Sequence, residues 1–404
     1  MRIPLSAPDI NEADIQAVTS VLRTTQLSMG PALEEFEQSI AAKMEMPYAI
    51  AVNSGTSALH LCLRAFGVGP GDEVIVPSFS FIAIANAIRY QGAIPVFVDI
   101  EPHSLNLDPA TIEEAITPRT RGIIVVHTFG FPAEMSAILH IARRRGLFVL
   151  EDACEAIGAE YYGSKCGTLG DAGVFAFYPN KQITAGEGGA IVTRNPEIAR
   201  FARKLRNQGR AESSGDFGHD YLGYNYRLSE MSCALGNAQL HRLDVILHRR
   251  ETIAAIYSEK LRGNQHLIVP PGNAPGRTIS WFVYVVRLAP HLDRKDREWI
   301  IAEMAARDIE CGRYFTPIHR QPVYKHEPCK THPLPITEWI DGRTLALPFF
   351  NRISESDIQD VCDALNELTH QCATAGSRKV ETADGPHSKT CVPCHPCSSR
   401  SSGS

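Results

Sequence analysis

One lysine of this sequence lies in surroundings that suit covalent chemistry. Lys181 belongs to the segment 175–189, Phe-Ala-Phe-Tyr-Pro-Asn-Lys-Gln-Ile-Thr-Ala-Gly-Glu-Gly-Gly, which joins an apolar run to a glycine-rich turn. A lysine in an ordinary surface loop would have polar neighbours, whereas these are mostly aromatic residues and glycines. Such surroundings desolvate an amine and favour its neutral form, which Schiff-base chemistry requires. Lys181 is therefore the first candidate for a catalytic residue.

Two other segments have residue types that suit a charged, phosphorylated cofactor. Asp152 lies in the segment 150–156, Leu-Glu-Asp-Ala-Cys-Glu-Ala, at the C-terminal end of an apolar run. Ligands of open α/β sheets collect at that edge, and a carboxylate there would need a cationic partner such as a protonated ring nitrogen. The segment 53–59, Asn-Ser-Gly-Thr-Ser-Ala-Leu, opens a helix whose free N–H groups would suit a phosphate. A plain Ser/Thr helix cap is the alternative for that segment.

The elements that must position these residues alternate between strands and helices over the first two thirds of the chain. Near-continuous apolar runs predict strands buried on both faces, at 73–76, 95–99, 122–127, 147–151, 174–177 and 190–193. Amphipathic helices separate them, as where Leu33, Phe36, Ile40 and Met44 share one stripe. This alternation predicts an α/β fold with a doubly wound, mostly parallel sheet.

The pattern changes near residue 240. A charged helix over 241–261 is followed by a Pro/Gly-rich turn at 270–276, a strand over 279–287, and helices over 297–306 and 357–368. We therefore predict a large domain over 1–240 and a small α+β domain over 241–372, and the N-terminal segment is a candidate to pack on the small domain. From 373 to 404 the composition of Ser, Gly, Lys, Thr and Pro predicts a disordered tail.

Composition excludes several classes of protein. Of the 404 residues, 44% are hydrophobic and 21% charged, values typical of globular proteins. Lys plus Arg is 40 and Asp plus Glu is 45, so the net charge of −5 argues against a nucleic-acid binder. No apolar run reaches the length of roughly 20 residues that spans a bilayer. A cytoplasmic protein without membrane or nucleic-acid partners is expected.

The cysteines also indicate a cytoplasmic protein. Eight of the eleven are scattered singly over the first 372 residues, without the spacing of a disulfide framework. Cys391, Cys394 and Cys397 have C-x2-C-x2-C spacing around His395, which is compatible with zinc. The tail has almost no large apolar residues to build a zinc fold, so an unstructured extension is favoured and no metal site is predicted.

The ordered motifs together resemble one family over most of the chain, from about Ile3 to Leu368. This is the DegT/StrS family of sugar aminotransferases, which are fold-type-I pyridoxal-phosphate enzymes. Besides the three segments above, the resemblance is carried by 26–31 (Gln-Leu-Ser-Met-Gly-Pro), 77–83 (Pro-Ser-Phe-Ser-Phe-Ile-Ala), 85–88 (Ala-Asn-Ala-Ile), 127–130 (His-Thr-Phe-Gly), 223–230 (Gly-Tyr-Asn-Tyr-Arg-Leu-Ser-Glu) and 314–319 (Tyr-Phe-Thr-Pro-Ile-His).

The resemblance implies a role for each matching residue. Lys181 would hold pyridoxal 5'-phosphate as a Schiff base and move a proton between the substrate and the cofactor. Asp152 would pair with the pyridinium nitrogen, so that the ring acts as an electron sink. The implied cofactor contacts further comprise Ser54, Gly55 and Thr56 at the phosphate, Asn225 reaching that phosphate from the other subunit of a homodimer, Phe81 stacked on the ring, and Glu155 near the phenolic oxygen.

Substrate contacts are less directly implied. Arg227 is a candidate for the carboxylate of the amino donor, and Tyr314 and His319 are candidates for substrate contact in a loop. An acidic protein that binds anionic sugar nucleotides must concentrate positive charge locally, and Arg227, Arg313 and the segment 203–210 are where that charge is expected.

Two positions depart from the family pattern. Ala176 stands where many members have a serine whose hydroxyl meets the phosphate, so one donor is missing here. Glu155 stands where many members have Gln or His, and a carboxylate beside a phenolate is repulsive unless one is protonated or water intervenes. Lys181 is intact, whereas members that dehydrate deoxysugars have His at that position.

The implied activity is transamination from L-glutamate or glutamine to a keto-sugar, most often a nucleotide-linked 4-keto-6-deoxy or 3-keto hexose. It would follow a ping-pong mechanism at sites shared within a homodimer, in the biosynthesis of amino sugars for a polysaccharide or an antibiotic. The alternatives are a cyclitol aminotransferase or a sugar dehydratase of the same fold and cofactor. A non-catalytic regulator that binds the cofactor is a further alternative, which retention of Lys181 and Asp152 disfavours.

Overall fold

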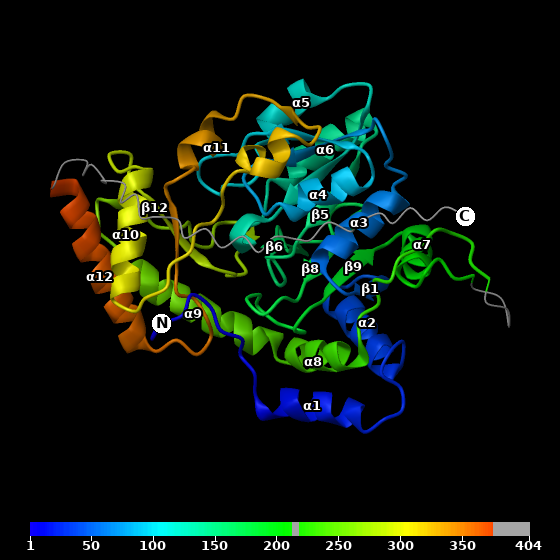
Figure 1. Ribbon diagram of the computed structural model, residues 1–404. Coiled ribbons are helices and arrows are strands. Elements are labelled where there is room, and N and C mark those ends of the chain that lie inside the picture. The colour runs from blue at the N-terminus through cyan, green and yellow to red at the C-terminus, as the bar shows by residue number, and fades with distance from the viewer. Residues whose placement is uncertain (212–217, 375–404) are drawn as a thin grey trace, which may run out of the picture.

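A mixed sheet forms the centre of the larger part of the molecule, on the right of Figure 1. The computed structural model describes residues 1–211 and 218–374, and within them this sheet has eight strands. Their order is β1 (Tyr48–Val52), β9 (Gly189–Thr193), β8 (Ala172–Ala176), β5 (Phe148–Asp152), β4 (Thr120–Val126), β2 (Glu73–Pro77), β3 (Ile94–Val98) and β13 (Lys330–Thr331). Strand β9 runs antiparallel to both neighbours and the other pairings between neighbours are parallel, which confirms the predicted mostly parallel sheet.

Helices cover both faces of this sheet because successive strand residues point to opposite sides. In β1, Ala49 and Ala51 face one core cluster, and Ile50 and Val52 face another. Helices on the first face are α2 (Pro31–Lys43), α5 (Ile112–Ala115), α6 (Met135–Arg145) and α8 (Glu230–His241), and those on the second are α3 (Gly55–Ala65), α4 (Ala83–Tyr90) and α7 (Pro196–Arg206).

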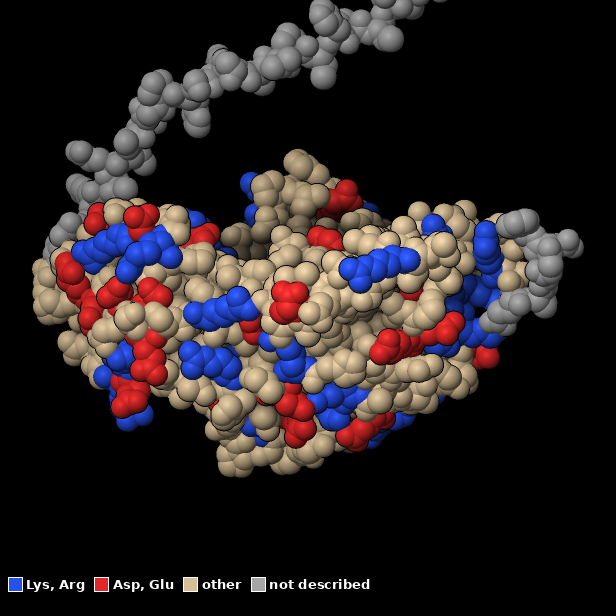
Figure 2. Space-filling model, turned by 90° about the horizontal axis from the view of Figure 1, so that it is seen from below, with Lys and Arg blue, Asp and Glu red and all other residues tan. Residues whose placement is uncertain are grey.

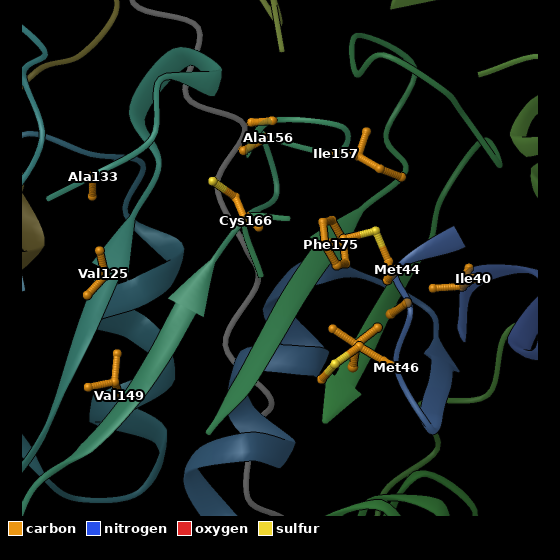
Figure 3. Close-up of a cluster of buried hydrophobic side chains, with 14 of the residues drawn as sticks. Ile40, Met44, Met46, Val125, Ala133, Val149, Ala156, Ile157, Cys166 and Phe175 are labelled. Carbon is orange, nitrogen blue, oxygen red and sulfur yellow. The ribbon is translucent and has the colours of Figure 1, made fainter. Parts of the chain in front are cut away.

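The core on the first face is built from segments that are far apart in the sequence. Figure 3 shows Ile40 and Met44, at the end of α2, near Met46 and Phe175 of β8. Val125 of β4 and Val149 of β5 continue the same layer. The predicted stripe on α2 is confirmed, because Leu33, Phe36, Ile40 and Met44 are all buried.

A second core lies at the left of Figure 1. It contains a three-stranded sheet of β10 (Leu267–Ile268), β12 (Tyr284–Leu288) and β14 (Thr344–Leu347), with α10 (Arg294–Ala306) and α12 (Glu355–Thr374). The long helix α9 (Leu243–Lys260) joins the cores: Leu243 and Ile246 belong to the first, Ile253 and Tyr257 to the second. The N-terminal segment also reaches the second core, where Ile3 forms a bridge with Ile309.

Some segments cross between the two parts, so the division at residue 240 stays a prediction. Strand β13 lies in the predicted small domain and extends the large sheet. Strand β11 (Arg277–Thr278) pairs with β6 (Glu160–Tyr161), which pairs with β7 (Ser164–Lys165). The remaining elements are α1 (Glu12–Leu22), α11 (Pro335–Ile340) and the 3-10 turns η1 (Pro109–Thr111), η2 (Thr128–Gly130), η3 (Ile318–Arg320) and η4 (Pro322–Lys325).

Two predicted elements differ in extent for local reasons. The helix predicted over 241–261 begins at Leu243, because Arg242 leaves the helical conformation and its guanidinium pairs with Asp9 and Asp14. The strand predicted from 279 begins at Tyr284. The carbonyls of Trp281 and Phe282 accept hydrogen bonds from buried Arg250 instead of from a neighbouring strand.

The described residues add three observations to the composition arguments. The eight cysteines of this part of the chain are all free thiols. Over the same ranges no helix is long and apolar enough to cross a bilayer, and no group of three or more His, Cys, Asp or Glu side chains is arranged to hold a metal ion. The tail from residue 375, with Cys391, Cys394, Cys397 and His395, lies outside the described residues.

Candidate active site

A cavity of about 460 Å³ lies at the carboxyl ends of the parallel strands. Val126 ends β4, Asp152 ends β5 and Ala176 ends β8, so three neighbouring strands deliver residues to its wall. The second part of the molecule supplies Phe282, Tyr314 and Phe315. The other lining residues are Ser54, Gly55, Thr56, Leu59, Ser80, Phe81, Ala83, Cys154, Glu155, Tyr178, Asn180, Lys181, Glu187 and Gly188.

Lys181 is held in the loop between β8 and β9 and reaches into this cavity. Its backbone N–H donates to the carbonyl of Tyr178 at 2.9 Å, which fixes a turn at the lysine. The side-chain Nζ lies 3.6 Å from Oε1 of Glu155 and 4.0 Å from the ring centroid of Phe282. The amine of Lys181 therefore lies close to both a carboxyl group and an aromatic ring.

Glu155 is buried beside the lysine. Its Oε2 accepts a hydrogen bond of 2.8 Å from the backbone N–H of Phe129. Burial raises the pKa of this carboxyl above its ordinary value, and the nearby Lys181 amine opposes that shift without cancelling it. The predicted repulsion at this position is therefore reduced, because the carboxyl is more readily protonated than one in water.

Asp152 is buried at the end of β5, with 8% of its surface exposed. Its Oδ1 accepts a 3.1 Å hydrogen bond from the backbone N–H of Cys154. Among the ion pairs of the described residues none involves Asp152. A buried carboxylate without a cationic partner costs free energy, so this residue fits a ligand that brings a positive charge.

Helix α3 begins at the other end of the cavity. Ser54 caps it, accepting from the backbone N–H of Ser57 at 3.1 Å. The N–H groups of Gly55 and Thr56 follow the cap and have no acceptor within the helix, so they are available to an anion. The site demands glycine at 55, because a Cβ there would lie 2.9 Å from Ala176 Cβ and 2.9 Å from Cys154 Sγ.

Two aromatic side chains of the cavity wall are unusually exposed. Phe81 has 61% of its surface exposed and Tyr178 has 51%. Large aromatic side chains usually bury most of their surface, because exposed apolar area is unfavourable in water. A flat aromatic ligand in the cavity would cover part of this area.

Comparison with known proteins identifies the family. Residues 8–366 match the model of the DegT/DnrJ/EryC1/StrS aminotransferase family. The chain belongs to this family. It is 42% identical over 369 residues to the GDP-perosamine synthase of Caulobacter vibrioides, covering 91% of this chain and 98% of that protein. It is 39% identical to the dTDP-3-amino-3,4,6-trideoxy-alpha-D-glucose transaminase of Streptomyces venezuelae, covering 87% and 90% of the two chains.

A solved structure identifies the cofactor of this family. The PLP form of the protein Spr1654 from Streptococcus pneumoniae superposes with a TM-score of 0.87, at 26% identity, over 91% of this chain and 99% of that one. The chain described here is therefore an aminotransferase that uses pyridoxal phosphate. The cavity fits this group: an amine for its aldehyde, a buried carboxylate for its ring nitrogen, and an open helix terminus for its phosphate.

Several predicted site residues do not line this cavity. Asn225 is exposed and forms a bridge with Asn207, and Arg227 donates to Asn207 Oδ1 at 3.0 Å. His319 lies against Ser78, with Nδ1 2.7 Å from the hydroxyl, and burial lowers its pKa. Tyr314 does line the cavity, and burial raises its pKa. The roles predicted for these residues stay predictions.

The expected concentration of positive charge is largely paired. Arg313 donates to Glu298 at 2.8 Å. In the segment 203–210, Arg203 and Arg206 pair with Glu37 and Lys204 pairs with Asp220. Figure 2 shows blue and red side chains interspersed over the face that it presents.

Phe282 and Gln182 are among the residues at or beside the cavity that sequence reasoning did not find. Gln182 is buried, and its Nε2 donates to the carbonyl of Glu155 at 2.6 Å and to the hydroxyl of Ser280 at 2.9 Å. The position of Gln182 directly after Lys181 in the sequence could have indicated that it lies beside the site. Phe282 had none, because it lies about 100 residues from Lys181 in an apolar run that reads as an ordinary strand.

Proposed function

We propose that this enzyme transfers an amino group from L-glutamate or glutamine to a nucleotide-linked keto-sugar, a 4-keto-6-deoxy or 3-keto hexose. The observation that carries the proposal is the meeting of Lys181, buried Asp152 and the N-terminus of α3 in one cavity. The names of the two relatives, a GDP-perosamine synthase and a dTDP-amino-sugar transaminase, favour a sugar linked to GDP or dTDP.

Each residue has a stated task in this proposal. Lys181 would hold the cofactor, and its amine would take up and return the proton at the substrate carbon. Asp152 would pair with the ring nitrogen, while Ser54, Gly55 and Thr56 would hold the phosphate. When bound, pyridoxal phosphate supplies the electron sink that makes the substrate C–H bond acidic.

The amino donor and the keto-sugar would use one cavity in turn, as a ping-pong reaction requires. The cavity has polar and aromatic walls, and the side chains at its rim include exposed Phe81, Tyr178 and Glu187. Arg227, Tyr314 and His319 are proposed to contact substrate, with Tyr314 already in the wall.

The working unit is proposed to be a homodimer with shared sites. Asn225 is exposed and is absent from the lining of its own chain's cavity, which suits a residue that serves the cavity of a second copy. The exposed faces of Phe81 and Tyr178 support the same idea. We place the enzyme in the cytoplasm, in the biosynthesis of amino sugars for a polysaccharide or an antibiotic.

The proposed substrates are tested by a matched screen. GDP- and dTDP-linked 4-keto-6-deoxy and 3-keto hexoses are incubated with enzyme and with either L-glutamate or L-glutamine, and the amino-sugar product is detected by mass spectrometry. We expect amination of at least one nucleotide-linked sugar, with stoichiometric release of the keto acid of the donor. Amination of free cyclitols but of no nucleotide sugar would contradict the proposal.

The shared site is tested by mixing two variants. In a K181A/N225A mixed dimer, one cavity receives Lys181 from one chain and Asn225 from the other. We expect mixing and reassociation to give more activity than either variant alone. Activity equal to the mean of the two variants would contradict sharing.

A further inference from the structure

Three backbone segments that are far apart in the sequence meet beside the lysine loop, and they leave no room for a side chain between them. They contain Gly130, which has a φ of 85°, Glu155 and Ser280. A Cβ at Gly130 would collide with the carbonyl of Ser280 and would lie 2.9 Å from the carbonyl oxygen of Glu155. The backbone N–H of Ser280 also donates to the carbonyl of Gly130 at 3.1 Å. The two carbonyls are therefore held close together.

The side-chain amide of Gln182 joins this junction to the lysine. Gln182 follows Lys181 directly in the sequence, and only 3% of its surface is exposed. Its Nε2 donates to the carbonyl of Glu155 at 2.6 Å, and to the hydroxyl and the carbonyl of Ser280 at 2.9 and 3.2 Å. The hydroxyl of Ser280 donates in turn to the carbonyl of Ile157 at 2.6 Å. One buried amide therefore connects the lysine loop with the loop after β5 and with the segment that leads into β12.

The segments joined by this amide also carry the side chains that face the lysine amine. Oε1 of Glu155 lies 3.6 Å from Nζ of Lys181. The ring centroid of Phe282, two residues after Ser280, lies 4.0 Å from the same Nζ. A buried amide that loses its hydrogen-bond partners is costly, so the hydrogen bonds of Gln182 resist a shift of any one segment against the others.

We propose that Gln182 is a positioning residue, which through its hydrogen bonds to Glu155 and Ser280 holds the amine of Lys181 where it meets the aldehyde of pyridoxal phosphate. Gln182 acts through the lysine and not on the cofactor, since it is not among the residues that line the cavity. A misplacement of about 1 Å at a reacting group can cost roughly 100-fold in rate. The inference rests on the proposed role of Lys181 in the function above.

The test separates binding of the cofactor from its joining to the lysine. Full-length enzyme is freed of cofactor and mixed with increasing concentrations of pyridoxal phosphate, and the absorbance is followed by stopped flow. The concentration dependence gives the Kd of the first, noncovalent complex and the rate constant of Schiff-base formation. In that step the amine nitrogen replaces the aldehyde oxygen, which leaves as water. A residue that only supports the fold would change the stability or both quantities, whereas a positioning residue changes the rate constant alone.

Two variants remove the two sides of the link. Q182M keeps the length of the side chain without its N–H donors, and S280A removes the hydroxyl. We expect the rate constant to fall roughly 10- to 100-fold in Q182M and about 5-fold in S280A, with the Kd of the first complex within about 2-fold of wild type. The double variant should be no slower than Q182M, because both changes act through one contact.

Q239M is the matched control. Gln239 is also buried, and its Nε2 donates to the carbonyl of Asp9 at 2.9 Å and to Oδ2 of Asp14 at 2.8 Å. None of these three residues lines the cavity. We therefore expect Q239M to lower the stability of the protein and to leave both the Kd and the rate constant unchanged.

Several outcomes would overturn the proposal. They are an unchanged rate constant in folded Q182M, an equal fall in Q239M, and a Kd that rises as much as the rate constant falls. Where Q182M fails to fold, S280A decides, because it removes a single hydroxyl, and an unchanged rate constant in S280A then overturns the proposal. Failure of the proposed function would be seen in the wild-type enzyme itself, as the absence of a Schiff base with Lys181 or of an amino-sugar product.

Discussion

The two ends of the cavity are built in opposite ways. At the end proposed to hold the phosphate, the N-terminus of α3 offers backbone N–H groups in a space so tight that a Cβ at Gly55 would lie 2.9 Å from Ala176. At the lysine end, Lys181 meets the side chains of Glu155, in the loop after β5, and of Phe282, just before β12. One end is a local backbone feature and the other depends on a contact between segments about 100 residues apart in the sequence.

This difference explains which changes each end tolerates. A site made of backbone N–H groups binds its ligand less well when a larger side chain fills the space. It binds the ligand more tightly when a hydrogen-bond donor is added. A side-chain site changes when a charge or a ring face is altered, because buried charges depend on their immediate partners. Changes at the two ends should therefore move different observables: cofactor affinity at one, and proton-dependent behaviour at the other.

Apart from replacement of Lys181, the largest loss of activity is expected for Asp152→Asn. An amide cannot hold a protonated ring nitrogen as a carboxylate does, so kcat should fall at least about 10³-fold, with the chain still folded. Steady-state kinetics with glutamate measure this. D171N is the matched control, because Asp171 lies just before β8 and outside the cavity. Equal loss in both variants would contradict the proposed role of Asp152 at the ring nitrogen.

Gly55→Ala tests the tight end. The added methyl group meets Ala176 and Cys154, and overpacking of roughly 1–3 kcal/mol corresponds to a Kd for pyridoxal phosphate that rises about 5- to 150-fold. The affinity is measured by absorbance titration of the cofactor-free enzyme. G69A is the control, since a Cβ at Gly69 meets nothing within 4 Å. An unchanged Kd for pyridoxal phosphate in G55A would contradict the claim that the space at Gly55 is too tight for a Cβ.

Glu155→Gln tests the lysine end through pH. Burial raises the pKa of Glu155, so above its ordinary pKa the folded chain binds more protons than the unfolded chain and stability falls as pH rises. Glutamine cannot ionise, so the free energy of unfolding of E155Q relative to wild type should increase between about pH 5 and about pH 8. Urea unfolding of the cofactor-free protein measures it. A difference that is constant or decreases with pH is the contrary result.

Ala176→Ser is expected to have the smallest effect, and in the favourable direction. A hydroxyl at the end of β8 would add one donor near the phosphate, worth about 1 kcal/mol, so the Kd for pyridoxal phosphate should fall about 5-fold. The same absorbance titration measures it. A83S places a hydroxyl elsewhere on the cavity wall and should leave the Kd unchanged. An equal gain in both variants would contradict a specific phosphate contact at 176.

The sequence predicted the local elements around the cavity better than the contacts between distant segments. Glycine and hydroxyl residues at a helix start form a local pattern, and the strand that ends at Asp152 is a near-continuous apolar run. Both were found because short-range sequence order determines them. Six of the strands of the large sheet were predicted within about two residues for the same reason.

The rest depended on contacts between distant segments. Nothing near Phe282 indicates that its carbonyl would be held by Arg250 or that its ring would face Lys181. The end of α8 at Arg242 is set by ion pairs with Asp9 and Asp14, which lie more than 200 residues earlier. Strand β13, only two residues long, carries too little pattern to be recognised.

The central proposal is that Lys181 joins the cofactor and that an amino acid, L-glutamate or glutamine, supplies the amine. The most direct measurement is the absorption spectrum of the wild-type enzyme and of K181A, each with and without L-glutamate. We predict a Schiff-base band in the wild type that bleaches as the donor, L-glutamate or glutamine, is converted to its keto acid, and no lysine-bound band and no turnover in K181A. A K181A enzyme with the wild-type band and full turnover would contradict the account.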